Sequence, residues 1–484
     1  MGLLLTGASG SGKTTLVGLL ALQLLRLGYP AVCLDPTGTL SEALLSLLLR
    51  SLQHVPLDEH AAIWRRIRYI DVGNPDVITP FPIYYRREGE TLREVAERFI
   101  DTLRLANPNL VKQASVTWPS LRRVGINTGM VLASLGFQLT EAEDLLFNTL
   151  DWEKSGLLQE AINRNPEAAP AVRYFRESYL PLSRSAKNQL TSAFLDHVFT
   201  FALDPKLQLL FGASTPGLDL DAGEEDGEFV ILDCKHVTDP EARRFVLLWI
   251  FQYLFPHIKA RGRRQHPLGL LIDEFAELAQ PVTDGVNPLA VRFDEFIQRY
   301  MRNHRIFFAC AFQSINQIDH QLRNTVLSLG NMVVGHTGTM EEARVLADVL
   351  FRKDPMRIKN VTHAWGRHET PPWYSWRLST RAIETGEYFP LEAIPHYMSL
   401  DEQHEEAAIR ISRLGLFHFL CRPALREGEV SEAVIPISIE RIVRDKKPGS
   451  MSLQIRNWSS GYAPVWQHAP AFPRRPSGKS RKHG

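Results

Sequence analysis

The sequence is poor in cysteine, and its four cysteines stand far apart. They are Cys33, Cys234, Cys310 and Cys421, and no C-x-x-C pair occurs among them. This spacing argues against a disulfide-stapled secreted domain and against a cysteine zinc site. Three of the four lie in apolar, strand-like runs, which predicts buried thiols in a reducing compartment.

The sequence also lacks a long hydrophobic run. The longest late apolar stretch, 245–255, contains Gln252 and is far shorter than the roughly 20 residues that span a bilayer. The apolar run at the N-terminus has no basic residues ahead of it and soon breaks into a glycine-rich loop, so it does not read as a signal peptide. We therefore expect a cytoplasmic chain that reaches the inner membrane face only through a partner.

Net charge is nearly absent. The 55 lysines and arginines balance 54 aspartates and glutamates, which leaves a formal charge of +1. No global field favours nucleic acid, so any DNA contact must come from local patches. The 484 residues, 44% of them hydrophobic, predict a large core and about two to four domains.

What the chain does contain, at its start, is the pattern of a phosphate-binding loop. Residues 2–6 predict a buried strand, and the apolar spacing of residues 15–27 predicts a helix behind the loop. Lysine would reach the β- and γ-phosphates of ATP, and the threonine after it would hold Mg²⁺. The residues expected around the phosphates are Gly7, Ser9, Gly10, Ser11, Gly12, Lys13, Thr14 and Thr15.

Strand patterns then alternate with helix patterns, which predicts an α/β fold with a doubly wound, mostly parallel sheet. The predicted strands are 2–6, 31–35, 68–71, 228–234, 268–274, 306–312, 331–335, 416–420 and 433–439. Between about 92 and 204 the patterns are helical only, which indicates an all-helical insertion. We divide the chain into a first core part (1–90), the all-α insertion (91–204), a second core part (205–445) and a basic tail (446–484).

Two acids end one of the buried runs. Asp273 would hold the Mg²⁺ through a bound water, and Glu274 would deprotonate the water that attacks the γ-phosphate. With the loop of residues 7–14, this pair predicts a hydrolytic site, on the expectation that the two segments lie on neighbouring parallel strands. Alone, two acids after a strand could equally be an acidic helix start.

Gln313 ends the following strand and would sense the γ-phosphate as a polar side chain. Arg302 precedes that strand and is placed to enter a neighbouring subunit's site as an arginine finger. Arg299 and Arg305 are rivals for this role, and each of the three could simply be a surface arginine.

Other features leave two interpretations open. Asp35 ends the second strand, where it could serve the nucleotide crevice or form a turn. The insertion contains basic residues among aromatic ones, which fits solvated helix faces better than a nucleic-acid surface; they are Arg122, Arg123, Arg164, Arg173, Arg176, Arg184 and Lys187, with Trp118, Tyr174 and Phe175. A polar stretch bearing Trp365, Trp373 and Trp376 reads as an insertion or loop, and the tail beyond 446 as disordered.

Together these motifs resemble the HerA and TraG type of P-loop ATPases, which include conjugative coupling proteins and DNA-translocating ATPases related to FtsK. The resemblance spans roughly residues 2–400 and is carried by residues 7–14, Asp35-Pro-Thr-Gly38, Leu271-Ile-Asp-Glu-Phe275, Arg302 ahead of Gln313-Ser314, and Gly330-Asn331. It implies a RecA-like fold, ATP and Mg²⁺ as cofactors, Arg302 as the finger in trans, and a homo-hexameric ring with DNA in its channel.

The chain departs from the family in two ways. Thr37 stands where many coupling proteins carry lysine, which is closer to HerA-like members. The sequence also shows neither the transmembrane helices of membrane coupling proteins nor the β-barrel of HerA. Either the motor works without them or the given start lies inside a longer protein.

The leading interpretation is an ATP-hydrolysing DNA-translocating motor in conjugative or mobile-element transfer, stimulated by DNA. A second keeps the motor but pairs it with a nuclease in DNA repair or phage defence. A third, of another class, is a nucleotide-gated binding module without turnover. The expected partners are DNA, further copies of the chain, and a relaxosome, membrane-anchor subunit or nuclease.

Overall fold

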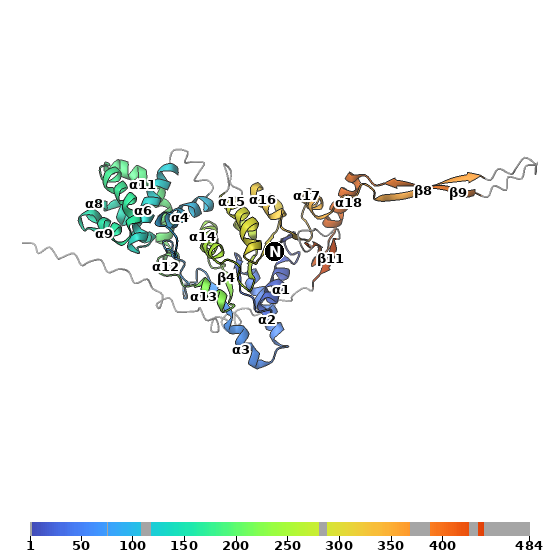
Figure 1. Cartoon of the computed structure of the whole chain (residues 1–484), viewed down its shortest axis with the longest axis horizontal. Helices are drawn as coiled ribbons and strands as arrows, with labels where there is room; N and C mark the ends of the chain where they lie inside the picture. The colour runs from blue at the N-terminus through green and yellow to red at the C-terminus, as the bar shows by residue number, and fades with distance from the viewer. Residues whose placement is uncertain are drawn as a thin grey trace, which may run out of the picture.

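The structure is a computed structural model, which describes residues 2–74, 76–107, 118–279, 288–367, 388–424 and 434–439. The tail predicted from 446, together with Trp373 and Trp376, lies outside the described residues. The described chain is elongated, with helices at one end, the sheet in the middle and a long hairpin at the other end (Figure 1).

A nine-stranded sheet forms the centre of the molecule, in the order β11-β10-β7-β1-β6-β5-β2-β4-β3. Every apolar run predicted to be a strand is one. The strands are β1 (Gly2–Thr6), β2 (Ala31–Asp35), β3 (Ile67–Asp71), β4 (Phe229–Asp233), β5 (Leu268–Ile272), β6 (Ile306–Phe312), β7 (Asn331–Val334), β10 (His418–Arg422) and β11 (Ile435–Ser438).

The sheet is parallel from β7 to β3, and β10 and β11 extend it in an antiparallel way. This confirms the α/β, mostly parallel fold. One expectation about it was wrong: the strand of the phosphate loop is not next to the strand that precedes Asp273. β6 lies between β1 and β5 and pairs with both. Sequence spacing cannot reveal such an order, because crossovers let strands insert between others.

Helices cover both faces of the sheet, and two separate apolar cores result. Along β1, Leu4 belongs to one core, whereas Leu3 and Leu5 belong to the other, because side chains alternate across a strand. The second core is closed by α1 (Lys13–Arg26) and α2 (Thr39–Leu52). The first is closed by α14 (Pro240–Ala260), α15 (Pro288–Glu295), α16 (His320–Leu327) and α17 (Met340–Leu350).

Within the described residues, the chain between β3 and β4 forms helices only. The longer ones are α4 (Leu92–Ala106), α6 (Trp118–Leu135), α9 (Leu157–Arg164) and α11 (Arg184–Leu203), and the shorter ones α7 (Ala142–Phe147), α8 (Thr149–Lys154), α10 (Ala169–Arg173), α12 (Pro205–Phe211) and α13 (Leu220–Glu225). This agrees with the helical texture of the sequence; the exact domain limits stay a prediction.

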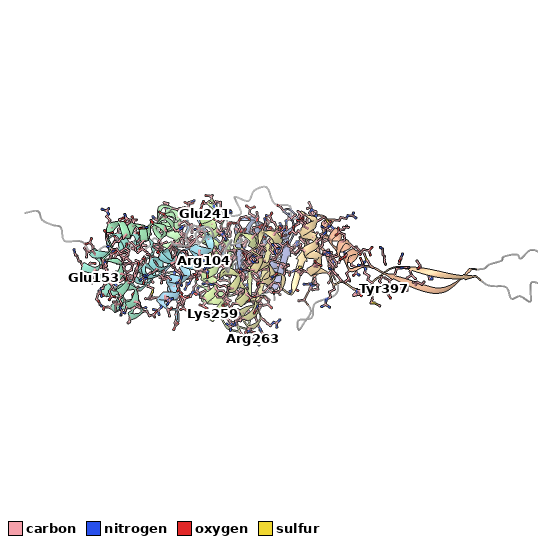
Figure 2. All side chains as sticks on the ribbon, turned by 90° about the horizontal axis from the view of Figure 1, so that it is seen from above. Arg104, Glu153, Glu241, Lys259, Arg263 and Tyr397 are labelled. Atoms are coloured by element: carbon pink, nitrogen blue, oxygen red, sulfur yellow. The ribbon has the colours of Figure 1, made fainter. Side chains whose placement is uncertain are left out.

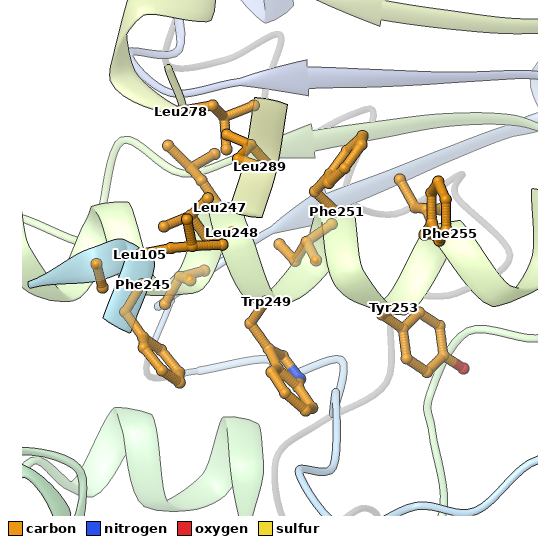
Figure 3. Close-up of a cluster of buried hydrophobic side chains, with 14 of the residues drawn as sticks. Leu105, Phe245, Leu247, Leu248, Trp249, Phe251, Tyr253, Phe255, Leu278 and Leu289 are labelled. Atoms are coloured by element: carbon orange, nitrogen blue, oxygen red, sulfur yellow. The ribbon is translucent and has the colours of Figure 1, made fainter. Parts of the chain in front are cut away.

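Helix α14 joins the helical part to the sheet. It is buried almost all round, with Phe245, Trp249 and Phe251 fully enclosed (Figure 3). Phe245 packs edge-on against Phe99 of α4, and the Trp249 indole N–H donates to the carbonyl of Phe81 at 3.0 Å. The apolar run seen in the sequence is therefore a core helix, as its length predicted. No helix in the described ranges has the length and apolarity needed to cross a bilayer.

Part of the polar stretch that was interpreted as an insertion or loop forms β-strands. β8 (Ile358–Arg367) and β9 (Tyr388–Tyr397) pair antiparallel and project away from the sheet, with Trp365 on β8 and Tyr397 at the base (Figure 2). The hairpin is followed by α18 (Leu400–Ser412), which packs against α17. The polar composition hid strands here because an exposed ribbon needs no buried face.

Two short helices lead into strands β3 and β4. Helix α3 (Leu57–Arg65) precedes β3. The acidic segment 223–227, ahead of β4, lies largely in α13, and Glu224 is buried there. Its charge is typical of a solvated turn, but in three dimensions Glu224 pairs with His257 and with the buried Arg261.

Candidate active site

The phosphate-binding loop connects β1 to α1 at the carboxyl edge of the sheet. Gly12 is the residue before α1 and has φ 100°, a left-handed conformation that favours glycine. Lys13 is buried, and its Nζ donates to the carbonyls of Gly7 at 2.6 Å and Ala8 at 3.0 Å. The lysine is thus folded over the loop in which phosphates are expected. Ser9 and Gly10 are exposed, Ser11 is buried, and Thr15 lies in the first turn of α1.

Thr14 and Asp273 meet although 259 residues separate them. The Thr14 hydroxyl donates to Asp273 Oδ2 at 3.0 Å, across the intervening strand β6. Thr39, at the start of α2, donates to the same oxygen at 3.5 Å. Two hydroxyls, from the first turns of α1 and α2, therefore converge on one carboxylate oxygen at the edge of the sheet.

Glu274 and Gln313 form the second pair. The Gln313 amide donates to Glu274 Oε2 at 3.0 Å, from the end of β6 to the end of β5. Glu274 has φ 53° and ψ 56°, the left-handed region that costs a non-glycine residue of order 1–3 kcal/mol. Such strain is concentrated at functional sites, where it aims a side chain that regular backbone would turn elsewhere.

Burial disfavours the charged form of each central group. It raises the pKa of Asp273 to about 6, and the negative charge of Asp35 acts in the same direction. Burial also raises the pKa of Glu274 and lowers the pKa of Lys13. A ligand that brings phosphates to Lys13 and a divalent cation to Asp273 would offset these costs.

The residues present fit a nucleotide triphosphate with Mg²⁺. The N-terminus of the 14-residue helix α1 has no side-chain cap and no acid in its first turn, so its backbone N–H groups are available to phosphates. Ser11 Oγ is buried there without a hydrogen-bond partner among the described residues. Thr14 and Asp273 supply the hard oxygens that Mg²⁺ prefers. Within the described ranges no cluster of three or more His, Cys, Asp or Glu that could hold a metal ion is found.

Asp35, left open between a site role and a turn role, forms the turn. Its carboxylate accepts N–H groups from Thr37 at 3.2 Å, Gly38 at 2.9 Å and Ser41 at 2.6 Å. The buried Asp35 thereby shapes the loop that carries Thr39 to Asp273. The sequence analysis did not predict Thr39 as a site residue. The signal for it was its position directly after the motif Asp35-Pro-Thr-Gly38.

Arg302 lies far from the site of its own chain. It comes just before β6, whereas Gln313 follows β6, so the two lie at opposite edges of the sheet. Its side chain is exposed, and no partner for its guanidinium is found in the described part of the chain. The rivals are engaged: Arg299 pairs with Glu295 at 3.5 Å, and Arg305 donates to the carbonyl of Gln265 at 2.9 Å.

The basic and aromatic residues of the helical part are mostly structural. Phe175 is fully buried and Tyr174 nearly so. Arg122 pairs with Glu97, and Arg176 pairs with Glu153. The interpretation as solvated faces over an aromatic core therefore fits these residues.

Neither a protein-family model nor a curated protein matches the chain. Among solved structures, the bacterial conjugative coupling protein TrwB, truncated at its N-terminus, is similar over 92% of this chain and 87% of its own, at 14% identity and a TM-score of 0.47. TrwB with ADP and Mg²⁺ gives the same coverage and score at 15% identity. VirB4 of Thermoanaerobacter pseudethanolicus is similar over 72% of this chain and 80% of its own, at 13% identity and a TM-score of 0.43. Likenesses this distant carry no argument about activity, for which the site is the evidence.

Proposed function

We propose that this protein is a P-loop ATPase that hydrolyses ATP to ADP and phosphate with Mg²⁺ and uses the energy to move DNA. The observation that carries the proposal is the convergence of two polar pairs on the edge where α1 begins. Thr14 meets Asp273, and Gln313 meets Glu274, from three different strands of the sheet.

Each residue has a task that its position supports. Lys13 and the N–H groups of α1 bind the phosphates, Thr14 and Asp273 hold the Mg²⁺, and Glu274 takes a proton from the attacking water. Bound Mg²⁺ would neutralise charge on the phosphate oxygens. The raised pKa of Glu274 suits a group that must accept a proton, because a higher pKa makes the carboxylate a stronger base.

The Glu274–Gln313 contact favours turnover over a nucleotide-gated switch. Binding a nucleotide requires the loop and the cation ligands. It does not require a carboxylate such as Glu274, held in a strained backbone conformation and hydrogen-bonded to the Gln313 amide. Hydrolysis does require such a group, positioned for water. The site therefore supports an enzyme.

DNA as the cargo, a homo-hexameric ring as the assembly, and conjugative or mobile-element transfer as the setting are the finer parts of the proposal. They are supported by the motif resemblance to HerA and TraG type ATPases. In that setting the partners would be a relaxosome and a membrane-anchor subunit.

The test is hydrolysis of Mg-ATP by the purified chain, with and without DNA at low salt, where electrostatic contacts are strongest. We expect DNA to raise turnover. Lys13→Ala should abolish both ATP binding and turnover. Glu274→Gln should lower turnover by about 10²–10⁴-fold, the usual contribution of a general base, while ATP binding persists.

Glu277→Gln is the matched control, since Glu277 lies three residues further on and pairs with Arg243 at 3.6 Å, outside the polar pairs. It should bind ATP like the wild type and lose far less turnover than Glu274→Gln, because it removes a charge that raises the pKa of Glu274 but leaves the base itself in place. If neither single- nor double-stranded DNA changes the rate of ATP hydrolysis, the proposed DNA-motor function is wrong. If Lys13→Ala and Glu274→Gln lose ATP binding equally, the roles assigned to these two residues are wrong.

A further inference from the structure

The segment between α18 and β10 lies against the phosphate-binding loop, although some 400 residues separate them in sequence. The backbone N–H of Phe417 donates to the carbonyl of Ser11 at 2.9 Å. A Cβ placed on Gly12 would lie 2.6 Å from Cδ1 and 3.0 Å from Cε1 of the Phe417 ring. The aromatic ring therefore rests directly on the glycine that precedes α1.

The strand order places this contact on the side of the loop that faces away from Asp273 and Glu274. Asp273 and Glu274 follow β5, which is reached from β1 through β6, so the γ-phosphate end of a bound triphosphate points that way. β7 and β10 lie on the other side of β1. Because β10 is antiparallel to β7, its first residues stand at the carboxyl edge of the parallel strands, beside the loop. A nucleoside that left the loop away from Asp273 would therefore meet Phe417.

Phe417 occupies this place at a cost. Its φ is 62°, a left-handed conformation that is unfavourable for an aromatic residue and that glycine would adopt without strain. The residue before it, Leu416, is 59% exposed. An apolar pair is thus held next to the phosphate loop, with Leu416 left largely in water.

We propose that Leu416 and Phe417 form the surface on which the nucleobase of the bound triphosphate packs. The inference rests on the proposed ATPase function and identifies its base-binding residues. An aromatic ring and an aliphatic side chain offer stacking and apolar contact, which every purine can use through its flat face. We therefore expect ATP and GTP to bind with similar affinity through these two residues.

The experiment compares two ligands in calorimetric titrations of the full chain with Mg²⁺ present. ATP has a base, and inorganic tripolyphosphate has the phosphates alone. Leu416→Ala and Phe417→Gly should each weaken ATP binding by about tenfold, within the range measured for losing one base-stacking contact. Both variants should bind tripolyphosphate like the wild type, and Phe417→Tyr should restore ATP binding.

The remaining outcomes overturn the inference in distinguishable ways. If Phe417→Gly weakens the binding of ATP and tripolyphosphate equally and Leu416→Ala has no effect, Phe417 only supports the conformation of the loop. If ATP affinity is unchanged in both variants, the nucleobase does not bind at Leu416 and Phe417. A wild-type chain that binds neither ligand would remove the proposed function itself. Leu27→Ala, which truncates a leucine 64% exposed at the far end of α1, is the control and should change nothing.

Discussion

Glu224 shows how a single residue can be misjudged from local sequence. Its acidic neighbours suggest a solvated side chain, yet its carboxylate is buried. It lies 2.9 Å from His257 Nε2 and 2.6 Å from Arg261 Nε. Burial alone raises the pKa of Glu224, but the hydrogen bond from His257 and the charge of Arg261 outweigh it and lower the pKa below its usual value. The folded state therefore favours the charged form.

We expect Glu224→Gln to lower the free energy of unfolding at pH 7 by about 3–5 kcal/mol, because it leaves the buried Arg261 uncompensated. The sign of the pH dependence follows from the lowered pKa. The stabilisation is complete above the unfolded value of about 4.5 and is lost as pH falls through the folded value. Urea titrations at pH 7 and pH 4 measure it, and the deficit of the variant should shrink at pH 4.

Glu225→Gln serves as the comparison. The neighbouring carboxylate is 74% exposed and lies 4.0 Å from Arg264. Its removal should change stability by less than about 0.5 kcal/mol. If the two variants lose the same stability, the buried ion cluster does not contribute as argued.

At the scale of elements, the helical part depends on a close crossing of α4 and α6. Gly129 of α6 faces Ala96 of α4, and a Cβ there would lie 2.9 Å from Ala96 Cβ and 3.3 Å from Ala96 Cα. No rotamer change relieves such a contact, because both atoms belong to the α4 backbone or are fixed to it. The sequence predicted both helices from their apolar spacing but not which residues meet.

Gly129→Ala should therefore destabilise the protein, by about 1–3 kcal/mol for the overpacking, offset in part by up to about 1 kcal/mol of helix propensity. Thermal unfolding followed by circular dichroism measures the lowered Tm. Gly338→Ala is the control, because a Cβ at Gly338 meets nothing within 4 Å. A Tm for Gly129→Ala at or above that of the wild type would show that the crossing adapts.

At the scale of the whole molecule, the position of Arg302 gives a way to test the proposed assembly. β6 has seven residues, so about 23 Å of strand separates Arg302 from the edge that holds Gln313. If Arg302 is the proposed arginine finger, it would have to act on a neighbouring subunit, as the proposed ring requires. Arg302→Ala alone and Glu274→Gln alone should both be nearly inactive.

Mixing these two variants tests the arrangement in trans. The Arg302→Ala subunit keeps an intact site, which would receive the finger of a Glu274→Gln neighbour. In an equal mixture about a quarter of head-to-tail interfaces pair an intact site with an intact finger. We expect partial recovery of ATP hydrolysis, measured with DNA present. Absence of recovery at every ratio would count against Arg302, whereas Arg299→Ala should stay active by itself.

What the sequence by itself determined is what local chemistry determines. Apolar runs of β-branched and leucine residues specify the strands, and glycines next to lysine and threonine specify the loop. Both are local signals, because they depend only on residues adjacent in the sequence. Asp273, Glu274 and Gln313 were recognisable as polar residues that end such runs. Their roles remain proposals, although the structure does bring them to one edge.

Tertiary structure decided how these pieces combine. Only the fold inserts β6 between β1 and β5, turns Asp35 inward to shape the loop of Thr39, buries Glu224, and lays Phe417 on Gly12. Each of these contacts joins segments through the order of strands or through burial, neither of which is encoded in any short window of residues. The phosphate-binding loop was visible from the sequence, whereas the strands that surround it were arranged by packing.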